Sequence, residues 1–127
     1  MGRTLQIRVS ATTYDTVEVE NRWPRLCGLA FSPVAVKIPA LPEERRGVVE
    51  LVEHLCDRLE LGLLPDDATR ALADAARKAR AAREALAAHL AEWNAREANR
   101  DTDAIEEALD ELEQRAKGLR NAPGLDR

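Results

Sequence analysis

Residues 66–117 read DDATRALADAARKARAAREALAAHLAEWNAREANRDTDAIEEALDELEQRAK and contain neither glycine nor proline. Alanine, leucine, glutamate and arginine dominate this run, and these residues lose little conformational freedom in a helix. Pro65 precedes the run, and proline is favoured where helices begin. Unbroken, the run would form a helical rod on the order of 75 Å long. The sequence therefore predicts an architecture decided by long α-helices.

Apolar side chains in and just beyond this run form two seams that are out of phase with one another. The first seam is Leu72, Ala75, Ala79, Ala82, Leu86 and Trp93, with Leu90 beside it, and the second is Ile105, Leu109, Leu112, Ala116 and Leu119. Polar residues separate the seams, and Asp103 and Glu106 have the spacing of a capping box. We expect a break near Asn99–Thr102 and a coiled-coil-like helical hairpin. One continuous helix is the alternative.

A further amphipathic helix is expected before this run. Pro42, Glu43 and Glu44 have the chemistry of a helix start, with proline in the first turn and acids near the positive end of the dipole. Apolar residues then recur at three- and four-residue steps, and Gly62 ends the pattern. The apolar positions are Val48, Leu51, Val52, Leu55 and Leu59. We expect a helical region over 42–120 and a flexible tail over 121–127.

The N-terminal residues have the period of β-structure. Leu5, Ile7 and Val9 alternate with polar residues, and Val17 and Val19 alternate with glutamates. A period of two is typical of half-buried strands, so the two runs are expected to pair as an antiparallel hairpin. The predicted fold class is α+β and mostly α. A small antiparallel β element in a β-rich region over 1–41 is followed by three helices, and one domain is expected overall.

Two alternatives remain open after Pro24. Leu26–Phe31 and Val34–Ile38 could add further extended structure to the β element. Equally, Leu26–Phe31 could form a short helix with Pro24 at its first position.

Composition favours association with another chain. The sequence is 45% hydrophobic but only 3% aromatic, so its core must be built from aliphatic residues and alanine. Alanine-rich helices bury little apolar area each, and thin cores of this kind are often completed by a partner. We therefore expect a homodimer, with a different protein partner as a further possibility. The formal net charge of −4 makes nucleic acid a poor partner, because phosphate binding needs a basic surface.

Targeting signals are not expected in this sequence. Residues 1–10 alternate charged and apolar side chains where a signal peptide would have an apolar core. The most apolar window, Leu26–Leu41, is too short to span a bilayer. We expect a bacterial-type cytoplasmic protein without membrane contact.

The residues that could carry chemistry do not form a motif. Cys27 and Cys56 have no C-x-x-C spacing, and we expect two free thiols. Glu50 and His54 share a helical face at i,i+4, but a metal site would need two further ligands. Serine occurs only at positions 10 and 32, and the glycines do not cluster into a phosphate-binding loop. We expect a non-enzymatic protein with no catalytic residue, cofactor or metal.

The helical seams are the predicted interaction surface. A lone tryptophan beside a polar segment offers unusual contact area, so Trp93 is the expected anchor, although it could instead cover the end of the hairpin as a core residue. The predicted interface residues are Trp93, Leu86, Leu90, Ile105, Leu109 and Leu112. The preferred function is protein–protein interaction or oligomerisation through amphipathic helices.

Charge is distributed in blocks along the long helical run. Arg77, Lys78, Arg80 and Arg83 form a basic block, and acidic residues crowd positions 101–113. If the run were one continuous helix, two antiparallel copies would bring these blocks together. Local pairs on a solvated face are the alternative.

The N-terminal residues also support an alternative function. Residues 5–10 read LQIRVS and residues 13–15 read TYD, which is similar to the opening of ribbon-helix-helix DNA-binding proteins. In such proteins, paired strands from two subunits enter the major groove. The resemblance implies that Gln6, Arg8 and Ser10 face the bases, with Thr4 as a further candidate. The alternative is a small DNA-binding regulator or antitoxin-like protein.

Overall fold

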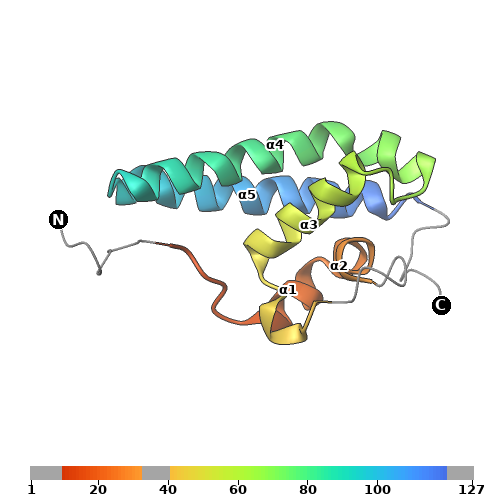
Figure 1. The fold of residues 1–127 in the computed structure, drawn as a ribbon, viewed down its shortest axis with the longest axis horizontal. Helices are drawn as coiled ribbons and strands as arrows, with labels where there is room; N and C mark the ends of the chain where they lie inside the picture. The colour runs from red at the N-terminus through yellow and green to blue at the C-terminus, as the bar shows by residue number, and fades with distance from the viewer. Residues whose placement is uncertain (1–9, 33–40, 120–127) are drawn as a thin grey trace.

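A computed structural model describes residues 10–32 and 41–119, and all regular structure within them is helical (Figure 1). The elements in chain order are α1 (Thr16–Arg22), α2 (Pro24–Phe31), the 3₁₀ turn η1 (Glu43–Arg45), α3 (Val48–Glu60), α4 (Asp66–Ala91) and α5 (Ala95–Ala116). Figure 1 shows α4 and α5 side by side along the longest axis. The α3 helix packs against α4 and α2, and α2 also contacts α5.

The predicted antiparallel β element is wrong where the structure describes it. Val17–Glu20 belongs to α1, which begins where the side chain of Asp15 accepts a hydrogen bond from the N–H of Val17 (3.0 Å). The helix buries Val19 and leaves Val17 61% exposed, so the two valines do not share a face. Alternation over four residues was too short a signal to exclude a helix with one inward residue. Leu5–Val9 and Val34–Ile38 lie outside the described residues.

The helical alternative for Leu26–Phe31 is confirmed. These residues lie in α2, and Pro24 occupies its first turn, where the missing N–H of proline costs no helical hydrogen bond. Leu26 and Leu29 are fully buried on its inner face.

The turn between α4 and α5 lies at Glu92–Asn94, so both the predicted break near Asn99–Thr102 and the continuous helix are wrong. The side chain of Asn94 accepts a hydrogen bond from the N–H of Glu97 (3.2 Å) and caps α5. The polar residues that suggested a break lie inside α5. Polarity alone does not end a helix whose outer face is in water.

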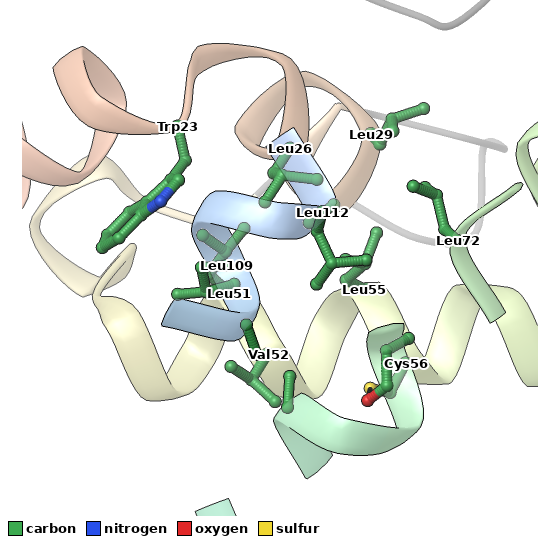
Figure 2. Close-up of a cluster of buried hydrophobic side chains, with 14 of the residues drawn as sticks. Trp23, Leu26, Leu29, Leu51, Val52, Leu55, Cys56, Leu72, Leu109 and Leu112 are labelled. Atoms are coloured by element: carbon green, nitrogen blue, oxygen red, sulfur yellow. Dashed lines mark hydrogen bonds between the residues drawn. The ribbon is translucent and has the colours of Figure 1, made fainter. Parts of the chain in front are cut away.

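Figure 2 shows that side chains from the N-terminal helices, α3 and the hairpin meet in one cluster. Trp23 and Leu26 contribute from the N-terminal part, Leu51 and Leu55 from α3, and Leu109 from α5. Each of these side chains is at most 2% exposed. The N-terminal helices are therefore part of the same core as the hairpin. None of the described helices combines the length and the apolar character that crossing a membrane requires.

Candidate interaction site

The predicted interface residues do not form one surface. Leu86, Ile105, Leu109 and Leu112 are buried in the core of the chain itself, and Leu90 is partly buried beside it. Trp93 differs from all of them, because it lies in the turn between α4 and α5 and is 69% exposed. The alternative in which Trp93 covers the hairpin end as a core residue is therefore wrong.

The backbone at Trp93 has the geometry that usually selects glycine. Its φ is +60°, and it is the non-glycine residue with positive φ among those the structure describes. The N–H of Trp93 donates to the carbonyl of Leu90 (3.1 Å), and the N–H of Asn94 donates to the carbonyl of His89 (2.8 Å). These two bonds form a Schellman motif, in which the left-handed residue is usually glycine and sometimes asparagine. A tryptophan here holds its side chain at the tip of the hairpin at a local cost.

Charged side chains surround the hairpin tip, which is defined here as residues 89–101. His89 Nδ1 lies 2.5 Å from Asp101 Oδ2, joining α4 to α5. The hydrogen bond to Asp101 and the nearby carboxylates raise the pKa of His89 above its ordinary value despite some desolvation. Arg100 pairs with Glu97 (3.3 Å). Arg96 is exposed, and within the described part of the chain it has no ion-pair partner.

An open pocket of about 350 Å³ lies between the segment 11–15, α1, the start of α3 and the hairpin. Buried apolar side chains form its floor, namely Val19, Trp23, Leu86 and Ile105. Tyr14 also lines the pocket and is fully exposed, so its ring stands at the mouth. Ligand pockets commonly combine an apolar lining with a few polar groups at this size.

The rim of the pocket is acidic. Among the residues that the structure describes, its carboxylates are Asp15, Glu18, Glu50 and Glu106, and Arg22 is the one lining cation. The guanidinium of Arg22 is already engaged, because it donates to Glu106 (2.9 Å) and Asp110 (3.0 Å). The mouth of the pocket therefore favours a cation that enters from outside.

Two tertiary hydrogen bonds fix the walls of the pocket. The Val48 N–H donates to Thr13 Oγ1 (2.7 Å), which holds the segment 11–15 against the first turn of α3. On the other side, Trp23 Nε1 donates to Asp110 Oδ1 (2.8 Å). Partial burial raises the pKa of Asp110, but the hydrogen bonds from Arg22 and Trp23 outweigh it and leave that pKa below its ordinary value. The bonds from Arg22 and Trp23 hold the end of α1 against α5.

The basic block of α4 is used within the chain. Arg80 pairs with Asp57 (3.3 Å) and also with Glu60, and Arg83 pairs with Glu53, so both arginines hold α3 against α4. Lys78 lies 3.7 Å from Glu111 of α5. Because the run is a hairpin, the predicted meeting of charge blocks between two continuous helices does not arise.

The residues considered for chemistry are scattered. Cys27 and Cys56 are buried free thiols, and burial raises the pKa of Cys27 to about 12 and that of Cys56 in the same direction. The ring of His54 packs edge-on against Phe31, with 5.6 Å between ring centres, while Glu50 lines the pocket. Thiols of high pKa are poor nucleophiles at neutral pH.

The structure describes only one of the three residues predicted to contact DNA. Gln6 and Arg8 lie outside the described residues, and Ser10 is exposed before α1. The short helix α1 follows, and it is seven residues long.

Sequence reasoning missed two buried charges that position these elements. The Glu113 carboxylate accepts hydrogen bonds from the N–H of Arg25 (3.3 Å) and the N–H of Leu26 (3.1 Å), and so caps α2 from α5. Arg58 Nη1 donates to the carbonyl of Leu29 at the other end of α2 (2.8 Å), and burial lowers the pKa of this guanidinium. Both residues sit at seam-adjacent positions of amphipathic helices, where a charge is normally solvated. No local signal distinguished them.

In comparisons with known proteins, no protein family, curated protein or solved structure matches the chain.

Proposed function

We propose that the protein is a non-enzymatic protein–protein interaction module whose hairpin tip presents Trp93 to a partner. The observation that carries the proposal is the combination of a left-handed backbone and a 69% exposed ring at this residue. Tryptophan is the residue most typical of interface hot spots. A cytoplasmic location remains a prediction, in keeping with the two unpaired cysteines.

The energetics of the turn support this reading. A left-handed conformation costs a residue with a β-carbon roughly 1–2 kcal/mol, a cost that glycine avoids. The exposed indole regains little of that cost through burial in its own chain. Strain of this kind concentrates at functional positions. Binding by a partner would bury the ring and offset the local cost.

The nucleophile chemistry supports a non-enzymatic role. Both thiols are buried with raised pKa values, so neither is poised to attack a substrate. The hydroxyl of Ser32 accepts a hydrogen bond from Arg58 (3.4 Å), and Ser10 stands exposed at the start of the described chain. Neither serine lies beside a histidine base within the described contacts.

Site-specific photo-crosslinking tests the proposal. A benzoylphenylalanine placed at position 93 keeps an aromatic side chain at the tip, and the same group at Leu61 provides a matched control. Leu61 is also 69% exposed but lies at the end of α3. Irradiation in living cells, followed by denaturing gels and mass spectrometry, should give a protein adduct from position 93 and none from position 61.

The outcomes separate cleanly. An adduct that forms at position 93 alone supports an interaction surface at the tip, whether the captured protein is a second copy or a different chain. Equal labelling at both positions would indicate nonspecific contact, and absence of any adduct at position 93 would overturn the proposal.

A further inference from the structure

We infer that the partner is a second copy of this chain: Trp93 of one copy inserts into the pocket between residues 11–15, α1, α3 and the hairpin of the other, and the exchange is reciprocal. This inference rests on the proposed function and names its partner. The chain carries both complementary parts, a projecting aromatic side chain and an open apolar pocket.

The pocket suits an indole in size and chemistry. Its volume of about 350 Å³ has room for one large side chain, and its floor includes the buried faces of Trp23, Leu86 and Ile105. An aromatic side chain prefers such a lining, because burying it removes on the order of 150–250 Å² from water. An indole also carries one N–H donor that needs an acceptor when buried. The rim carboxylates Glu18 and Glu50 supply acceptors of that kind.

Charge complementarity points to the same occupant. Arg96 lies three residues after Trp93, and within the described part of the chain no ion pair engages it; Glu92, next to Trp93, is exposed and also unpaired there, so the complementarity depends on Arg96. The rim that would receive it contains Asp15, Glu18 and Glu50, and the described contacts include no ion pair for any of these. Asp15 caps α1 through the N–H of Val17, so Glu18 and Glu50 are the rim carboxylates that the arginine near the projecting ring would meet. Opposite charges facing one another set the register of an interface.

The spacing along the hairpin allows a closed dimer. Leu86 of the pocket precedes Trp93 by seven residues, which corresponds to about 10 Å along a helix. Two hairpin tips that overlap in opposite directions by this length bring each Trp93 to the pocket of the other copy. A two-fold axis relates the two contacts, so the assembly stops at two copies.

Complementation between two variants tests the exchange. Trp93→Gly removes the projecting ring at a position whose backbone suits glycine, so the fold is retained. Thr102→Trp places a large side chain on the α5 wall of the pocket and fills it. In sedimentation velocity, each variant alone should dissociate about a hundredfold more readily than the parent chain. A mixture of the two should recover a dimer with one intact contact, because each variant retains the part that the other lacks.

Controls keep the result independent of folding. Circular dichroism and thermal unfolding should give both variants the parental helix content, and Leu61→Ser removes an equally exposed apolar side chain away from the tip. If Thr102→Trp does not fold, Arg96→Glu gives a separate test of the charge contact outside the complementation, because glutamate is favourable in the first turn of α5. Arg96→Glu should weaken the dimer at least tenfold at low salt, whereas Arg70→Glu, an exposed arginine of α4, should not.

The possible failures are distinguishable. A parent chain that stays monomeric at high concentration overturns the exchange. So does a dimer that Trp93→Gly and Thr102→Trp leave intact, or a mixture that gains nothing over the separate variants. If the parent is monomeric and position 93 still crosslinks to a different protein in cells, the proposed function stands and only the identity of the partner is wrong.

Discussion

Gly47 precedes α3 at a point where the backbone lies directly against Thr13. A β-carbon built at Gly47 would lie 2.6 Å from Glu50 Oε1 and closer still to Thr13 Oγ1. The carboxylate can swing away, but the threonine hydroxyl accepts the hydrogen bond from Val48 that holds the pocket wall. The close approach therefore requires glycine, although its φ of −90° is ordinary.

Gly47→Ala should lower the free energy of unfolding by about 1–3 kcal/mol, the usual cost of forcing an added carbon into a packed site. Urea denaturation followed by circular dichroism measures the change. Gly118→Ala is the matched control, because the nearest atom to its added carbon is the carbonyl oxygen of Arg115 at 3.6 Å. The control should change stability by less than about 0.5 kcal/mol. Equal effects at the two glycines would contradict the contact with Thr13.

Residue-scale detail was the part of the candidate site that sequence reasoning could least supply. Trp93 was expected at an interface, but its left-handed backbone was not, because that conformation selects glycine or asparagine in most chains. Asn94 was the residue from which the position of the turn could have been predicted. Its side chain is a preferred helix cap, and a cap at this position would have placed the turn before Ala95, five residues ahead of Asn99, where the predicted break began.

At the scale of elements, α2 depends on residues far away in the sequence. It has eight residues and no side-chain cap of its own. Its first N–H groups donate to Glu113 of α5, and the carbonyl of Leu29 near its end accepts from Arg58 of α3. Negative charge at the first turn and positive charge at the last both favour the helix dipole. An isolated helix of this length would be unstable in water.

Glu113→Ala should therefore destabilise the protein by about 2–4 kcal/mol, because it leaves two amide groups of α2 without their acceptor. Hydrogen exchange should show faster exchange at the amides of Arg25 and Leu26, and urea denaturation gives the free energy. Glu107→Ala, at an exposed position of the same helix, serves as the control and should leave both measurements nearly unchanged. Loss of stability without faster exchange in α2 would argue against the capping role.

The contact between His89 and Asp101 makes the α4–α5 pairing sensitive to pH. Because the pKa of His89 is raised in the folded protein, the bond contributes most below the ordinary histidine pKa and weakens as pH rises through the raised value. His89→Gln should therefore lower the thermal midpoint more at about pH 6 than at about pH 9, where the imidazole is neutral.

Asp101→Asn supplies the control for this pH dependence. It removes the carboxylate with the largest effect on the charged imidazole, so a further change of His89 should show a much smaller difference between the two pH values, with Glu92 and Glu97 still present. A gap between parent and His89→Gln that is constant with pH would contradict the assignment.

At the scale of the whole molecule, the sequence predicted the long helices better than the N-terminal third. The apolar residues of 48–59 lie in α3, and the run that starts at Asp66 begins with α4. These predictions succeeded because an amphipathic period that repeats over several turns is typical of an α-helix and of no other regular structure. The α1 and α2 helices are only seven and eight residues long, and contacts with α5 determine their conformation. The alternation of valine and glutamate in Val17–Glu20 is a local pattern, and it carries no information about contacts with α5.

The order in which the ribosome makes the chain gives the α5 contacts a further consequence. Trp23 and Leu26 bond to Asp110 and Glu113, partners that lie 87 residues later. At typical elongation rates of roughly 5–20 residues per second, Trp23 and Leu26 wait on the order of ten seconds for those carboxylates to be synthesised. During translation, α2 therefore depends on α5, which is made after it, and chaperones that bind apolar nascent segments have a long opportunity at α2 before α5 emerges.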